Sequence, residues 1–329
     1  MFSRDAYSYL AQGAMLRDGF DPYVDGPVVN PGILLDNVSN VWKTTTTPYG
    51  PVHLLLGGAG ITSLTDDNVV LGTWLWRLLM LPGLVLMAWA VPKLARRMGG
   101  DPTIALWLAV LNPLVLIHLV GGVHNELLMV GLMMAGIVLV LERRHVGGIA
   151  LVSLGAAIKA TAGLALPFLI WVWMVHERDR AREEEREPAA PPIRLFAKTA
   201  GIGVVVFAAV FGAASALAGV GIGWLTALSG SSKIINWLSL PTMAAHAVTW
   251  VTPWRLGSVL EVTRTICMLA LVAILVWAWW RFRRTERDAV LGIVVALTAV
   301  TVLSPPAALR GTTRGRSRSP RRSRCRRGR

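Results

Sequence analysis

Windows of about 20 mainly apolar residues recur along the chain, and each is close to the length a helix needs to cross the hydrocarbon core of a membrane. Six such windows carry few charged side chains. They lie at residues 69–92, 102–121, 126–141, 196–219, 261–280 and 289–304. We therefore expect an all-α, multi-pass transmembrane helical bundle.

Two further apolar stretches fit this scheme less simply. Residues 146–175 are too long for one crossing and are interrupted by the segment AAIKATAG, so we expect two short helices that meet near Lys159. Residues 240–256 form either a further helix or a segment at the membrane interface, where Trp250 and Trp254 would fit an aromatic belt.

Composition also favours a membrane protein. Hydrophobic residues make up 54% of the 329 and charged residues 16%, whereas soluble domains carry about 25% charged residues. The net charge of +14 depends on ten arginines between 310 and 329, without which 23 basic residues face 19 acidic ones, a balance of +4. The basicity thus belongs to one tail, and we expect no nucleic-acid partner. Cys267 and Cys325 suggest no disulfide framework.

Lysine and arginine in short loops indicate orientation, because such loops stay in the cytoplasm. The first 68 residues contain only three basic side chains, whereas KLARRMGG, ERRH and RFRRTERD are strongly basic. We expect residues 1–68 to form an extracytoplasmic loop with an amphipathic interfacial helix. Residues 69–304 would form the transmembrane core, with a charged cytoplasmic loop at 176–195. Residues 305–329 would be an Arg-rich tail, disordered or frameshifted.

Polar residues interrupt the apolar pattern at a few places on the expected outer side. His124, Asn125 and Glu126 stand side by side where a helix begins, and Lys159 lies in the turn of the short helix pair. Charged groups in hydrocarbon are costly, so they usually face a cavity or a partner. We expect these residues to meet in a polar pocket that the N-terminal loop, with Asp5, can close.

Each of these residues also has a purely structural interpretation. Asp5 and Glu126 could serve only as favourable partners of a helix dipole, and His124 and Asn125 could cap a helix. We expect His53 and His118 to be packed and hydrogen-bonded. Arg77 could be a second buried cation or could extend outward to the interface.

Motifs of soluble enzymes are missing from the sequence. It contains no phosphate-binding Gly-rich loop, no dinucleotide fingerprint, no zinc-ligand spacing and no nucleophile elbow. Its many glycines lie in apolar segments, where small residues permit close packing of helices. An ATP-driven role is therefore not expected.

Four segments, in this order, carry a resemblance to a known family: SRDAYSYLAQGAMLRDGFDPYVDGP, TTTTPYGPVH, LNPLVLIHLVGGVHNELLMVGLMMAG and AAIKATAGLALPFL. From about residue 2 to 305 the chain resembles the C-type membrane glycosyltransferases. It is most similar to the actinobacterial polyprenyl-phosphomannose-dependent α-1,6-mannopyranosyltransferases of lipomannan assembly. The resemblance implies transfer of mannose from polyprenyl-phosphate mannose to a mannan or glycolipid acceptor, with inversion, at the outer face of the plasma membrane.

The resemblance also implies roles for individual residues. An acidic residue of the first outer loop acts as the base in such enzymes, and Asp5 stands at the matching place, so we predict it to be catalytic. Lys159 would stabilise the departing phosphate. The substrates would be held by His124, Asn125, Glu126, Lys159 and Tyr49. The expected partners are the lipid-linked donor, the acceptor and membrane lipids, with no cofactor certain and a divalent metal left open.

The chain departs from the family pattern at both ends. Family members usually begin with a spanning helix ahead of the acidic loop, and they continue with apolar helices where this chain has AALRGTTRGRSRSPRRSRCRRGR. We therefore expect a truncated N-terminus and a frameshifted or misread C-terminus. Two alternatives to a transferase remain: a flippase or transporter for polyprenyl-linked sugars, and an inactive, truncated membrane protein.

Overall fold

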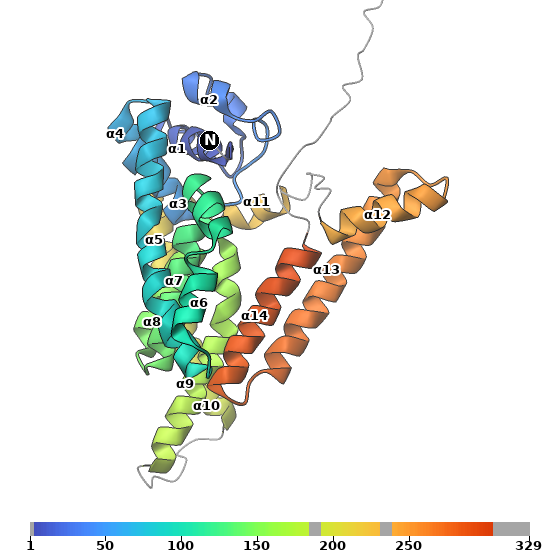
Figure 1. Cartoon of the computed structure of the whole chain (residues 1–329). Coiled ribbons are helices and arrows are strands. Elements are labelled where there is room, and N and C mark those ends of the chain that lie inside the picture. Colours follow the sequence, from blue (N-terminus) through green and yellow to red (C-terminus); the bar gives the residue numbers. More distant parts are fainter. Residues whose placement is uncertain (1–2, 184–191, 231–238, 305–329) are drawn as a thin grey trace, which may run out of the picture.

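The computed structural model describes residues 3–183, 192–230 and 239–304, and all regular elements in these ranges are helices (Figure 1). The predicted all-α fold is confirmed. The tail at 305–329 and part of the charged loop predicted at 176–195 lie outside the described residues.

Helices follow one another through the chain in this order: α1 (Asp5–Arg17), η1 (Pro27–Val29), α2 (Ile33–Asn37), α3 (Pro51–Leu55), η2 (Leu56–Thr62), α4 (Ser63–Thr65), α5 (Val69–Arg97), α6 (Pro102–Ala109), η3 (Val115–Gly121), α7 (Glu126–Leu141), α8 (His145–Ala156), η4 (Ala160–Ala165), α9 (Leu166–Glu183), α10 (Pro192–Ala218), α11 (Trp224–Gly230), α12 (Leu240–Val251), α13 (Leu256–Arg281) and α14 (Glu286–Leu303).

Four helices within the described ranges are long and apolar enough to cross a membrane, and the bent pair η3–α7 would add a fifth. The four are Val69–Arg97, Ala160–Glu183, Ile193–Ala218 and Leu256–Arg281. Their outward faces carry many exposed apolar side chains, such as Trp74, Val205 and Trp277. Such a surface suits contact with lipid, and the chain is a membrane protein.

Close helix packing in the bundle of α5, α7 and α8 depends on glycine, as predicted. A Cβ added to Gly83 of α5 would lie 2.3 Å from the carbonyl oxygen of Leu127, and one added to Gly136 of α7 would lie 2.7 Å from the carbonyl oxygen of Gly148. No other residue type permits these distances without a shift of the backbone. These contacts set the positions of α5 and α8 relative to α7.

One predicted crossing differs from the structure. The helix expected over 102–121 ends at Ala109, and a separate π-helix, η3, follows from Val115. Asn112 and Pro113 lie in the break, where the side chain of Asn112 accepts a hydrogen bond from the backbone N–H of Leu114 (2.8 Å). Proline lacks the N–H that would continue the helix. The axes of η3 and α7 then form a bend of 112°.

The N-terminal elements gather at one end of the bundle, beside the start of α5 (Figure 1). Nine residues of α1 are buried on several sides, from Ala6 to Met15, whereas an interfacial helix would bury one face. Gly13 packs directly on Gly57 of η2. At the end of α1, Arg17 binds Asp18 and Asp67 (both 2.8 Å), and its guanidinium lowers the pKa of Asp18.

Residues 146–175 fall in α8, η4 and α9, so this stretch is divided near Lys159 as predicted. The second helical part is not short, however, because it runs from Ala160 to Glu183 and includes the first residues of the loop predicted at 176–195. In the second uncertain region, α12 spans only 12 residues, and Trp250 and Trp254 near its end are exposed. The helices α13 and α14 lie side by side and lean away from α5 (Figure 1), while α14 contacts α9.

Candidate functional site

Asp5 is the first residue of α1, and its side chain is 26% exposed. The hydroxyl of Ser3 accepts a hydrogen bond from the backbone N–H of Asp5 (3.2 Å), which helps to start the helix. A carboxylate at this position interacts favourably with the helix dipole. The side chain nevertheless lies within reach of residues far along the chain.

His124, Asn125 and Glu126 occupy the bend between η3 and α7. The residue before them, Val123, is buried and has a φ of 58°, in the left-handed region that β-branched residues avoid. Such backbone strain persists only where the surrounding structure enforces it, and it is common at functional sites. Here it turns the chain so that His124 and Glu126 lie beside Asp5.

Lys159 lies in the connection from α8 to η4, with extended backbone. This connection is fixed to the N-terminal segment, because the backbone N–H groups of Gly50 and Val52 donate to the carbonyls of Ile158 and Ala157 (both 2.9 Å). A Cβ on Gly50 would lie 2.2 Å from the Ala157 oxygen. Glycine at position 50 thus lets the TTTTPYGP segment approach Lys159.

The structure brings four ionisable side chains together, which we call the carboxylate cluster: Asp5, His124, Glu126 and Lys159. The Lys159 ammonium donates a hydrogen bond to Glu126 and forms an ion pair with it. His124 Nδ1 lies 3.6 Å from Asp5 Oδ2 and 3.7 Å from Glu126 Oε2. Three distant segments of the chain, beginning at residues 5, 124 and 159, contribute to it.

Several polar atoms around the carboxylate cluster are buried and have no hydrogen-bond partner. They are His53 Nε2, His124 Nε2, Asn125 Oδ1, Glu126 Oε2 and Thr161 Oγ1. Buried polar groups are normally paired, because an unmet donor or acceptor costs about 1–3 kcal/mol. The Lys159 and Glu126 side chains are still 30% and 28% exposed. An incoming polar molecule could therefore satisfy these atoms.

Aromatic rings cover one side of the carboxylate cluster. Tyr49, predicted to bind substrate, has the Lys159 ammonium 5.8 Å from its ring centroid. Tyr9 meets Tyr49 edge to face (5.3 Å between centroids), and His53 stacks on Trp76 (5.0 Å). All five residues predicted to bind substrate therefore lie in or beside the cluster.

His53 was expected to be packed and hydrogen-bonded, and it is: its Nδ1 lies 3.1 Å from the Asn125 amide nitrogen. Because an amide N–H donates, Nδ1 accepts and the proton of neutral His53 is on Nε2. Burial lowers the pKa of His53 to about 3, so the ring is neutral at pH 7. His53 therefore belongs to the candidate site, although the sequence analysis did not include it there. The only signal for it in the sequence is its position shortly after PYGP.

His118 was also expected to be packed and hydrogen-bonded, whereas Arg77 had two open interpretations. His118 is exposed rather than buried, and its ring stacks on His124 (4.3 Å between centroids). Arg77 reaches toward the carbonyls of Val120 and Gly121 at the end of η3 (both 3.4 Å), and it packs over Trp74 (4.5 Å). It thereby contacts the end of η3 that precedes the bend. Among the described side chains, no group of three or more His, Cys, Asp or Glu is arranged to hold a metal ion.

Comparisons with known proteins assign the family. Residues 1–175 match the family model described as "Alpha-(1->6)-mannopyranosyltransferase, N-terminal domain", and residues 238–308 match "MptB C-terminal domain". The first match contains the whole carboxylate cluster. No solved structure matches the chain.

Curated relatives agree with these matches. The chain is 52% identical to alpha-(1->6)-mannopyranosyltransferase A of Mycobacterium tuberculosis over 94% of its own length and 59% of the relative. It is 42% identical to the protein of the same name from Corynebacterium glutamicum over 92% of its own length and 64% of that relative. The chain thus spans about three fifths of these relatives. Taken together, the matches show that it belongs to the alpha-(1->6)-mannopyranosyltransferase family.

Proposed function

We propose that the chain transfers mannose from polyprenyl-phosphate mannose to a hydroxyl of a mannan acceptor, forming an α-1,6 linkage with inversion at the outer face of the plasma membrane. Asp5 acts as the base, and Lys159 binds the phosphate. His124, Asn125, Glu126 and Tyr49 hold the sugar and the acceptor.

A single observation carries this proposal: two carboxylates, a lysine and a histidine from three distant segments meet among polar atoms that have no partner in the protein. A cluster built only for stability would satisfy those atoms. Sugars carry many hydroxyls that donate and accept hydrogen bonds, and aromatic rings such as Tyr49 suit their apolar faces. The printed names of the relatives supply the sugar and the linkage.

The chemistry is one displacement. The acceptor hydroxyl oxygen attacks the anomeric carbon of mannose, and its proton passes to the Asp5 carboxylate. The bond between that carbon and the phosphate oxygen breaks, and polyprenyl phosphate leaves with the electron pair. Because the leaving group is a stabilised anion, it needs no protonation, so one carboxylate base is sufficient.

Lys159 forms an ion pair with Glu126 in the structure. A donor phosphate near the ammonium would compete with Glu126 for it, and the developing negative charge would strengthen the new contact. The released Glu126 carboxylate would then be free to accept hydrogen bonds from sugar hydroxyls. This exchange explains why the cluster keeps a second carboxylate close to the base.

The test is a transferase assay on membranes that contain the full chain, with polyprenyl-phosphomannose and a synthetic mannosyl acceptor. Asp5→Asn should lower the rate by about 10²–10⁴, the usual contribution of a general base, while membrane insertion is unchanged. Asp36→Asn is the matched control, because Asp36 lies on the exposed surface of α2 in the same loop. The anomeric configuration of the product, read by NMR, should be α.

Two results would contradict the proposal. Full activity of Asp5→Asn would remove Asp5 from the role of base. Movement of labelled polyprenyl-phosphomannose across vesicle membranes without any new glycosidic product would favour a flippase instead.

A further inference from the structure

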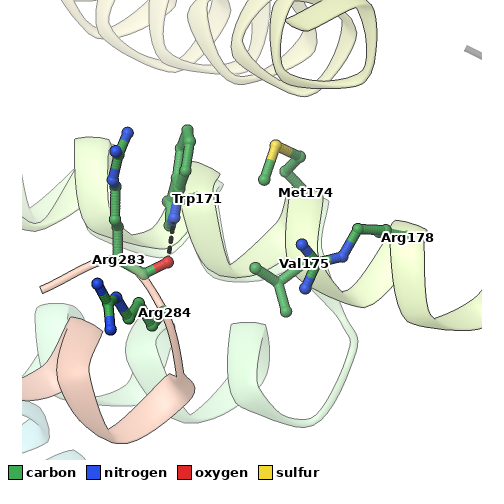
Figure 2. Close-up of a pocket in the computed structure, with 6 residues that line it drawn as sticks. All are labelled: Trp171, Met174, Val175, Arg178, Arg283 and Arg284. Carbon is green, nitrogen blue, oxygen red and sulfur yellow. Dashed lines mark hydrogen bonds between the residues drawn. The ribbon is translucent and has the colours of Figure 1, made fainter. Parts of the chain in front are cut away.

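A second charged site lies on a different part of the molecule, between α9 and the turn that joins α13 to α14. It is a pocket of about 440 Å³ lined by Trp171, Met174, Val175, Arg178, Arg283 and Arg284 (Figure 2). None of these residues belongs to the carboxylate cluster. Three of the six are arginines, and none is acidic.

The positive charge of this pocket is incompletely neutralised. In the part of the chain that the structure describes, Arg283 and Arg284 form no ion pair, and Arg178 has only Asp179 at 3.6 Å, too long for a hydrogen bond. The Nε atom of Arg178 is buried and has no hydrogen-bond partner. A guanidinium presents several donors in a fixed plane, which suits phosphate oxygens.

Tryptophan side chains hold the arginine-bearing turn in place. The indole N–H of Trp171 donates a hydrogen bond to the carbonyl of Arg283, drawn as the dashed line in Figure 2. The guanidinium of Arg283 lies 3.3 Å from the ring centroid of Trp280 and 5.2 Å from that of Trp171. Such cation–π contacts fix the plane of the guanidinium and leave its N–H edges available.

The remaining walls are apolar. Met174 is buried, Val175 lines the pocket beside it, and Trp280 of α13, which packs against Arg283, is exposed. The anionic headgroup of an amphiphile would therefore contact the arginines, and the apolar part attached to that headgroup would contact the apolar surface. This combination matches an amphiphile whose polar end is a phosphate.

We propose that this pocket binds a phosphate-bearing anion through Arg178, Arg283 and Arg284. A phospholipid headgroup and free phosphate share this chemistry, and the apolar walls favour the lipid. The site is separate from the proposed transferase site, so the two proposals can fail independently. Binding here would add to the existing contacts between α9 and the α13–α14 turn.

The experiment titrates the purified full chain in neutral detergent with phosphatidylglycerol, with zwitterionic phosphatidylcholine and with inorganic phosphate, and it counts bound molecules by native mass spectrometry. Arg284→Gln and Arg178→Gln should each weaken phosphatidylglycerol binding about tenfold or more, since each removes hydrogen bonds to a charged group. Arg281→Gln is the matched control, because it removes one charge from the end of α13, next to the same turn, without lining the pocket. It should bind as the unaltered chain does.

Each outcome decides the proposal. Phosphatidylglycerol binding that is preferred over phosphatidylcholine and lost only in the pocket variants supports a lipid headgroup. Saturable binding of inorganic phosphate that is lost in the same variants, without a preference among lipids, supports a soluble anion. Equal losses of binding in Arg281→Gln and Arg284→Gln, or no loss of binding in any variant, would overturn the proposal. Because Arg284 is exposed, its replacement tests binding even if Arg178→Gln fails to fold.

Discussion

Two networks of charged and histidine side chains lie at opposite ends of α7 and α8, and they differ in how completely they are paired. One is the carboxylate cluster at the start of α7. The other, which we call the histidine network, joins His145, His176, Glu286 and Arg97. About 24 Å of helix separate the two ends of α7, which has 16 residues.

The histidine network forms one chain of hydrogen bonds. His145 Nε2 and His176 Nδ1 lie 2.8 Å apart, His176 Nε2 lies 2.7 Å from Glu286, and Arg97 Nε lies 3.0 Å from the other Glu286 oxygen. A carboxylate only accepts, so His176 Nε2 carries a proton and, in the neutral ring, Nδ1 accepts from His145. Bonding to His176 lowers the pKa of the Glu286 carboxyl.

The two networks differ in how completely their polar groups are hydrogen-bonded, and this difference indicates different roles. The histidine network joins α5, α8, α9 and α14, and its members satisfy one another, as expected of a group that holds helices together. In the carboxylate cluster, the contacts of His124 are longer than 3.5 Å and several buried atoms have no partner. We infer that the histidine network stabilises the bundle and that the carboxylate cluster binds a ligand.

After the replacement of Asp5, the replacement of Lys159 should cause the largest loss of transferase activity. Lys159→Ala should lower kcat/KM for polyprenyl-phosphomannose by about 10²–10³, the range observed when one stabilising group is removed from a developing anion. Lys43→Ala is the control, because it removes a lysine of the same N-terminal half for which the described part of the chain shows no hydrogen bond or ion pair with the cluster. If donor kinetics were unchanged in Lys159→Ala, Lys159 would not bind the phosphate.

The opposite pattern is expected in the histidine network. Glu286→Gln removes the charge that His176 and Arg97 share, and it should lower the free energy of unfolding by about 1 kcal/mol, because solvent partly screens these groups. The mannosyl transfer rate per folded molecule should stay within about twofold of the unaltered chain. Thermal unfolding in detergent and the transferase assay measure the two effects separately. If Glu286→Gln abolished transfer but left the stability unchanged, the histidine network would have a role in function and our assignment would be contradicted.

The smallest expected effect is a pH dependence of stability. Burial, together with the neighbouring His176, lowers the pKa of His145 to about 4, whereas an unfolded histidine titrates near 6.5. Between about pH 6.5 and 4 the unfolded chain therefore binds the extra proton, and this part of the stability is lost as the pH falls. The midpoint of thermal unfolding should fall over that window, and His145→Gln should flatten the fall. An equal fall in both proteins would contradict the assignment.

Much of the fold follows from apolar length alone. The window at 126–141 coincides with α7, and that at 196–219 with most of α10. The break between α6 and η3 was missed because the window was judged by its hydropathy, although Pro113 lies within it. The burial of α1 also could not be predicted, since it depends on Gly13 meeting Gly57, a contact between distant segments.

The site could also be predicted only in part, because some of its contacts join segments that are distant in the sequence. Charges that stand out against an apolar background, such as Glu126 and Lys159, are visible in the sequence, and the helix count put them on one side. His53 lies 72 residues before its partner Asn125, and no local pattern announces such a pair. The left-handed conformation of Val123 was equally hidden, because valine disfavours it.

The claim on which the account depends is that Asp5, His124 and Lys159 share one water-accessible site on the opposite side of the membrane from Glu286. Single cysteines at positions 5, 124, 159 and 286, introduced after Cys267 and Cys325 are replaced by serine, can be labelled with a membrane-impermeant thiol reagent on intact cells. We expect labelling at the first three positions without permeabilisation and at position 286 only after it. Labelling of positions 5 and 159 from opposite sides would contradict the account.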